Sequence, residues 1–194
     1  MSKQKTLKKL DTKTMVGVGL LTAIVVVLQL LGGGIRFGIF SISLVLVPIV
    51  VGAAQYGWQA GGWLGFVFGM TVLLNGDAAP FMAVDALGTI ATVLLKGAGC
   101  GIAAGFVYKL FSKNRWVAVI ASAVICPIVN TGIFLIGCKL FFYETIAAWG
   151  AAAGFANAAS YMFLGLAGTN FLVELGANIV LAPVIVRLIK IGKK

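Results

Sequence analysis

The chain has 194 residues, of which 61% are hydrophobic and only 10% are charged. An ordinary soluble domain is about half apolar and about a quarter charged, so this composition excludes a typical water-soluble globular protein. The apolar excess must face a solvent other than water, and lipid is the available one. We therefore expect an all-α integral membrane protein.

The charge distribution indicates membrane topology rather than a nucleic-acid site. The net charge is +10, from 15 Lys and Arg against 5 Asp and Glu, and a basic excess can indicate nucleic-acid binding. Here, however, the basic residues gather at the two ends and in one middle loop instead of alternating with the apolar runs. We therefore expect a lipid bilayer, and no nucleic acid, as a partner.

The residue types that hold metals or carry out common catalysis are scarce. The sequence contains no histidine, which excludes His-ligated metals and His general bases. Cys100, Cys126 and Cys138 lie in apolar runs without zinc-like spacing, so we interpret them as small buried hydrophobic residues. No P-loop, Gly-x-Ser-x-Gly elbow or HExxH motif is present. The sequence therefore predicts a protein that is not an enzyme and carries no metal or cofactor.

Six apolar runs approach or exceed the length of about 20 residues that a spanning helix needs. In chain order they cover residues 14–31, 41–56, 60–74, 81–111, 116–142 and 161–189. A glycine-rich segment at 32–40 follows the first run, and an Ala/Gly-rich connection at 143–160 precedes the last. We predict a basic segment at 1–13, a single six-helix transmembrane domain at 14–190 and a basic tail at 191–194.

The basic flanks set the orientation of these spans. One side collects the N-terminal segment, the loop between the fourth and fifth runs, and the C-terminal tail. Its basic residues are Lys3, Lys5, Lys8, Lys9, Lys13, Lys109, Lys113, Arg115, Arg187, Lys190, Lys193 and Lys194. The other side receives Arg36, Asp77, Asp85 and Glu144, with Lys139 nearby. We expect Asp77 and Asp85 to solvate the loop or to cap a helix. Because Lys and Arg accumulate in short cytoplasmic loops, we predict that both termini are cytoplasmic.

Glycines recur every four residues in two of the runs. They are Gly61, Gly65, Gly69, Gly97, Gly101 and Gly105, in the third and fourth runs. Ridges of small residues let helix backbones approach closely in lipid, and we expect these two ridges to pack within the chain. Gly19 and Ala23 form a further small pair in the first run, where docking of another membrane subunit is a hypothesis.

Two charges interrupt the apolar runs near the middle of the membrane. Lys96 lies about 16 Å beyond Asp85 along a helix, and Glu174 lies about 20 Å beyond Tyr161. Counted from the outer surface, both reach a similar depth, so their side chains can meet. Charges inside spans are costly and usually functional. We hypothesise that this pair belongs to a binding site, and the alternative is a structural ion pair.

Amide side chains from the last two runs accompany these charges. Asn170, Glu174 and Asn178 are spaced i, i+4 and i+8 and share one face of a helix. Asn130 and Lys139 lie in the fifth run. Polar groups that converge in a mostly apolar cavity describe a small-molecule site. The alternative is that the Asn side chains only hydrogen-bond between helices.

Aromatic residues and one outer arginine complete this hypothetical site. Phe134, Tyr161 and Phe163 lie in the same runs and would line an apolar cavity. Arg36 lies in the glycine-rich outer segment. It either closes over the cavity or is a solvated loop residue, and the sequence leaves both open.

With these features assembled, the sequence resembles the substrate-binding S-components of energy-coupling factor (ECF) transporters, the small six-helix subunits of vitamin uptake. The resemblance extends over nearly the whole chain and depends on layout more than on any one motif. Its stretches are GLLTA at 19–23, VPIVVGA at 47–53, GGWLGFVFG at 61–69 and NFLVE at 170–174. The resemblance implies a compact helical bundle in the plasma membrane of a bacterium.

The resemblance also implies a mode of action and a set of partners. Substrate would be captured from outside in a pocket built mainly by the last three helices and closed by the first outer loop. Gly19 and Ala23 would dock on the transmembrane coupling protein, although Ala is usual in the family where Gly19 stands. Two separate ATPase subunits would supply the energy, in agreement with the missing P-loop. The S-component would then topple in the membrane to release its substrate inside.

The identity of the substrate follows less directly from the sequence than the fold does. Lys96, Lys139 and Arg36 would suit a carboxylate or phosphate, whereas Glu174 and the Asn side chains would suit hydroxyls or amides. Pantothenate and riboflavin both fit such a pocket, and a metal ion is disfavoured without histidine. The runner-up interpretation is a stand-alone ion- or proton-coupled carrier that uses Lys96 and Glu174 as its relay.

Overall fold

The computed structural model describes residues 12–34, 36–37, 40–41 and 44–192, which are almost entirely helical. The helices are α1 (Thr12–Gly34), α2 (Leu46–Tyr56), α3 (Trp58–Leu74), α4 (Ala79–Met82), α5 (Ala86–Leu110), α6 (Arg115–Phe141), α7 (Tyr143–Ala152), α8 (Ala158–Ser160), the π-helix η1 (Tyr161–Gly168), α9 (Thr169–Val180) and α10 (Ala182–Gly192). Between α1 and α2, the strands β1 (Arg36–Phe37) and β2 (Phe40–Ser41) form an antiparallel pair with Arg36 opposite Ser41.

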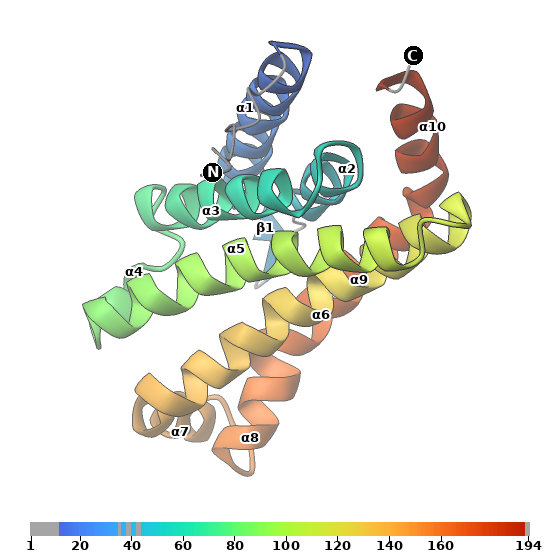
Figure 1. Cartoon of the computed structure of the whole chain (residues 1–194). Helices are drawn as coiled ribbons and strands as arrows, with labels where there is room; N and C mark the ends of the chain where they lie inside the picture. Colours follow the sequence, from blue (N-terminus) through green and yellow to red (C-terminus); the bar gives the residue numbers. More distant parts are fainter. Residues whose placement is uncertain (1–11, 35, 38–39, 42–43, 193–194) are drawn as a thin grey trace, which may run out of the picture.

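The long helices lie side by side in a bundle. α3, α5 and α6 follow one another across the molecule, and α9 packs along α6 (Figure 1). α4 and α7 lie at one end of these helices, and the loop between α5 and α6 lies at the other (Figure 1). The start of α1 and the end of α10 lie on the same side of the molecule, at the top of Figure 1.

Four helical stretches in the described part are long and apolar enough to cross a membrane. They are Thr12–Gly32, Ala86–Leu110, Arg115–Phe141 and Ala158–Val180. α2 and α3 are also apolar but have only 11 and 17 residues. At about 1.5 Å per residue, α2 is about half as long as a hydrocarbon core of about 30 Å is thick. The helical membrane class is therefore supported, whereas the predicted count of six spanning helices is not confirmed.

Three predicted runs are divided differently in the structure. The second run becomes helical only at Leu46, and Gly57, with a φ of 94°, separates α2 from α3 in a conformation that favours glycine. The fourth run is split by Asp85, whose Oδ1 accepts a hydrogen bond from the Gly88 amide at 2.9 Å and so caps α5. The capping role predicted for Asp85 is confirmed.

The sixth run is not one helix. It begins with the π-helix η1, continues as α9 and ends at Leu181. After Leu181 the chain turns, and α10 runs in a different direction from α9 (Figure 1). Pro183 stands in the first turn of α10, where a missing backbone N–H removes no intrahelical bond. α10 buries Ile185 and Ile189 while Arg187 is exposed. The amphipathic α10 was not expected from the apolar run, and neither was α7 within the predicted 143–160 connection.

The two glycine ridges pack within the chain, as predicted, and the structure shows in addition that they pack against each other. A Cβ at Gly65 would overlap the carbonyl oxygen of Gly97, and a Cβ at Gly61 would overlap that of Gly101. The overlaps are reciprocal, so the two backbones touch along this interface. Only glycine permits such an approach, which brings α3 and α5 into the most extensive contact in the bundle.

Some predicted features lie outside the described residues. Most of the predicted N-terminal segment, residues 1–11, and the last two residues of the predicted tail, 193–194, belong to this group. The backbone of Arg36 is described in β1, but its side chain is not. Cys100, Cys126 and Cys138 are described, and all three are free and buried, which confirms the interpretation as small hydrophobic residues.

Substitution of Gly65 tests this backbone contact. We expect Gly65→Ala to lower the free energy of unfolding by about 1–3 kcal/mol, because the new methyl group meets a main-chain oxygen that has no room to move. The measurement is thermal unfolding of the purified protein in detergent. Gly176→Ala in α9 is the matched control, since a Cβ there meets no atom within 4 Å. Equal stability of both variants would contradict the proposed contact.

Candidate functional site

Lys96, on α5, is a half-buried charged residue that lies between α3 and α6. Its ammonium lies 5.7 Å from the ring centroid of Phe68 on α3 and 5.3 Å from that of Phe134 on α6. Both rings are within the range of a cation–π interaction. Among the described residues, no carboxylate lies within 4.0 Å of this ammonium. The charge of Lys96 is therefore held by two aromatic faces, and its N–H donors have no protein acceptor in the described part.

Glu174 lies on α9 and is almost completely buried, with 3% of its surface exposed. Asn170, one turn earlier, donates a long hydrogen bond of 3.5 Å to Glu174 Oε1. The side-chain amide of Asn130, on α6, lies beside this carboxylate and interacts favourably with it. The amide of Asn178 donates to the backbone carbonyl of Glu174 at 2.9 Å. The predicted Asn–Glu–Asn face of the last long span is thus assembled around Glu174.

Lys96 and Glu174 face the same side of α6. Phe134, beneath the Lys96 ammonium, and Asn130, beside the Glu174 carboxylate, are four residues apart, which is about one helical turn. The two charges interact electrostatically, and Asp77 adds a further negative charge that acts on Lys96. The site therefore draws one side chain or more from each of α3, α5, α6 and α9.

Several buried oxygens near these charges accept no hydrogen bond from the described residues. They are Thr92 Oγ1, Asn130 Oδ1, Asn170 Oδ1 and Asn178 Oδ1. Asn130 and Asn178 are only 5% and 1% exposed. A buried acceptor without a donor costs about 1–3 kcal/mol, so these oxygens favour a bound molecule that supplies N–H or O–H groups.

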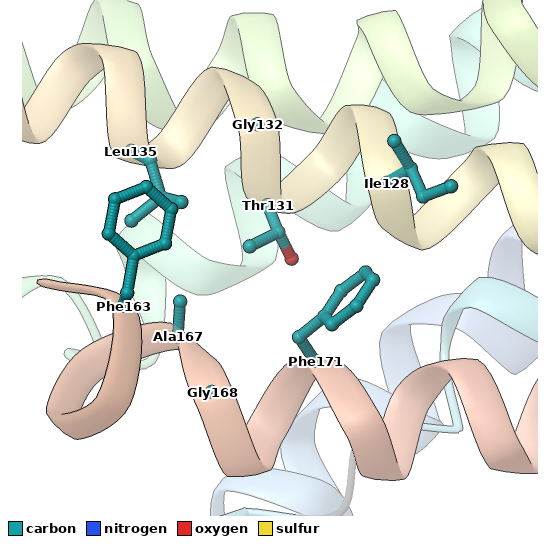
Figure 2. Close-up of a pocket in the computed structure, with 8 residues that line it drawn as sticks. All are labelled: Ile128, Thr131, Gly132, Leu135, Phe163, Ala167, Gly168 and Phe171. Carbon is teal, nitrogen blue, oxygen red and sulfur yellow. The ribbon is translucent and has the colours of Figure 1, made fainter.

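A separate cavity of about 240 Å³ lies between α6 and the segment formed by η1 and α9. Figure 2 shows the two helical segments facing each other across it, with Phe163 beside Leu135 and Phe171 pointing into the space. Its lining residues are Ile128, Thr131, Gly132, Leu135, Phe163, Ala167, Gly168 and Phe171. None of the described substrate-binding candidates lines this cavity. Phe163, which the sequence hypothesis grouped with the charged residues, lines this cavity.

The remaining candidates lie away from the charged cluster. Lys139 is exposed in the last turn of α6. Gly19 and Ala23 are exposed on α1, and a Cβ at Gly19 would meet no atom within 4 Å. By contrast, Gly17 faces inward against the Tyr56 side chain. The Gly19–Ala23 pair therefore faces outward from the bundle, toward lipid or a partner.

Sequence reasoning missed Phe68, Thr92 and Gln29. Phe68 carries no signal, because its pairing with Lys96 depends on how α3 packs on α5. Thr92 is one small polar residue in an apolar run. Gln29 did have a signal, since an amide inside the first span needs a partner. Its Nε2 donates to Asp77 Oδ2 at 2.8 Å and so links α1 to the turn after α3.

The comparisons with known proteins give one match. Residues 13–186 match the family described as ECF transporter, substrate-specific component. The chain matches no curated protein and no solved structure.

The link between α1 and Asp77 can be tested by substitution. We expect Gln29→Leu to lower the free energy of unfolding by about 1.5–3 kcal/mol, because it removes a hydrogen bond to a carboxylate. Thermal unfolding in detergent measures the change. Gln59→Leu is the control, since Gln59 is exposed at the start of α3 and makes no hydrogen bond in the described part. A Gln29→Leu variant as stable as this control would show that the link contributes nothing.

Proposed function

Because the chain belongs to the family of ECF transporter substrate-specific components, we propose that it captures a water-soluble vitamin or related small molecule from outside the cell. The family is one of transport subunits in a cell membrane and is not a family of enzymes. The observation that carries the proposal is the cluster around Lys96 and Glu174. It places inside an apolar bundle one cation without an ion-pair partner among the described residues, one buried carboxylate, and several amide oxygens that accept no hydrogen bond from those residues.

The hydrogen-bonding groups of this cluster suit a small organic substrate. The Lys96 ammonium offers donors to a carboxylate, phosphate or carbonyl oxygen. The oxygens of Asn130, Asn170 and Asn178 offer acceptors to hydroxyl or amide groups. Few precisely placed polar groups in an apolar surrounding are typical of ligand sites. Pantothenate and riboflavin remain the proposed examples, and Arg36 and Lys139 are proposed to guide a substrate at the outer end.

We further propose that α1 docks on a transmembrane coupling protein that works with two ATPase subunits. Support comes from the exposed Gly19 and Ala23 and from the small share of α1 that the rest of the bundle covers. A smooth surface of small residues allows a partner helix to approach closely in lipid. The proposed setting is a bacterial plasma membrane with both termini cytoplasmic. The exposed Lys109, Lys113 and Arg115 between α5 and α6 support this orientation.

Docking is tested by co-purification. We expect the tagged chain to recover a membrane coupling protein and two ATPases from its own host, and Gly19→Leu or Ala23→Leu to lower this recovery at least about tenfold, because a leucine prevents close helix contact. Gly19→Ala is the matched control and should retain recovery. If neither coupling protein nor ATPases are recovered although the chain is folded, the stand-alone carrier is favoured instead.

Substrate capture is tested by mass spectrometry of small molecules released from the purified protein. We expect Lys96→Ala and Glu174→Gln to lower the released amount or the affinity at least about tenfold, which corresponds to about 1.4 kcal/mol of binding free energy. Folded yield should change less than about twofold. Lys109→Ala, exposed at the far end of α5, is the control. Loss of folded yield with intact affinity would show that Lys96 and Glu174 serve the structure rather than the ligand.

A further inference from the structure

The two charges of the site balance each other. Lys96 contributes one positive charge and Glu174 one negative charge, and they interact electrostatically. Asp77 also acts on Lys96, but more weakly than Glu174 does, and its Oδ2 accepts hydrogen bonds from the side chains of Gln29 and Asn75, each at 2.8 Å. Lys139 is exposed at the end of α6, where solvent weakens its influence. Among the side chains that the structure describes, Lys96 and Glu174 therefore form an inner cluster without net charge.

An additional charge in such a place is unfavourable. A charge in a low-dielectric interior loses its hydration, and only a close opposite charge restores that loss. A net anion would be attracted by Lys96 but repelled by Glu174. A net cation would be attracted by Glu174 but repelled by Lys96. A molecule without net charge avoids both penalties.

The hydrogen-bonding groups point to the same kind of molecule. Within the described part of the chain, Lys96 has donors without a protein acceptor, whereas Asn130 and Asn178 have buried oxygens without a donor. One molecule that satisfies both must carry acceptors and donors at different places. Phe68 and Phe134 add aromatic surface that suits an apolar body.

We propose that the site selects a molecule without net charge, neutral or zwitterionic, that has an apolar body, an acceptor for Lys96 and N–H or O–H donors for the Asn oxygens. A net anion built on the same scaffold binds more weakly. This inference rests on the proposed function, since it names the substrate class of the same site. The inference favours riboflavin over pantothenate as the substrate, because riboflavin has no net charge and pantothenate is an anion.

The test compares charged and uncharged forms of two scaffolds. The probes are riboflavin and riboflavin 5′-phosphate, and panthenol and pantothenate, each titrated into the purified full chain in detergent. For any scaffold that binds, we expect the uncharged form to have a dissociation constant at least about tenfold lower. An anionic form that binds as tightly as its uncharged form, or more tightly, overturns the inference but leaves the proposed function standing.

Two substitutions separate charge from shape, because each keeps the approximate size of its side chain. Glu174→Gln leaves Lys96 in excess, so the affinity for the anionic form should rise at least about tenfold relative to the uncharged form. Lys96→Met should shift this ratio in the opposite direction. Lys109→Met removes a positive charge outside the site and should leave the ratio unchanged. A ratio that Glu174→Gln does not move also overturns the inference.

A result without binding is informative too. If none of the four probes binds, the small molecule released from the purified protein decides the question by its net charge at neutral pH. A neutral or zwitterionic compound supports the inference, and a net anion or cation overturns it. If no probe binds and no compound is released, the proposed function itself fails, and the inference fails with it.

Discussion

The backbone contact between α3 and α5 is the constraint on which the rest of the structure depends. Lipid gives apolar helices no hydrophobic reason to associate, so close packing must supply the attraction. Gly65 and Gly97 allow that packing because neither has a Cβ to separate the two main chains. The same contact positions the site, since Lys96 directly precedes Gly97 and Phe68 lies one turn after Gly65. Packing of the glycines thus places the ammonium over the aromatic ring.

The site forms where this tightly packed part meets the C-terminal helices. α6 packs along α5 on one side, where Gly137 lies against Thr92, and along α9 on the other, where Asn130 meets Glu174. The buried oxygens without a hydrogen-bond partner among the described residues belong to these three helices, α5, α6 and α9. The π-helix η1 leads directly into the stretch that carries Asn170 and Glu174, and π-helical turns are often found at functional sites. Polar groups that a purely structural bundle would satisfy internally are thus without a partner in the described part, which supports the proposed ligand site.

Much of the fold follows from local sequence signals. The length and apolarity of the first, fourth and fifth runs predicted α1, α5 and α6 to within a few residues, apart from the turn at Asp85. The every-fourth-residue glycines predicted the ridge contact, because such spacing has one main physical use in lipid. The short α2 and the break at Leu181 were not predictable in this way. An apolar run indicates that a segment is in contact with lipid or with the protein interior. It does not indicate where a helix ends within either environment.

The sequence by itself determined the helical membrane class of this protein, its long apolar helices, its family, and which charges and amides inside those helices need a structural or functional explanation. These follow from residue types and from their spacing along one helix. Only the tertiary structure decided which groups face one another: Phe68 beneath Lys96, Asn130 beside Glu174, and Gln29 on Asp77. The physical reason is that each pair joins two helices. The rotation and depth of one helix against another depend on all the side chains between them, and no short stretch of sequence contains that information.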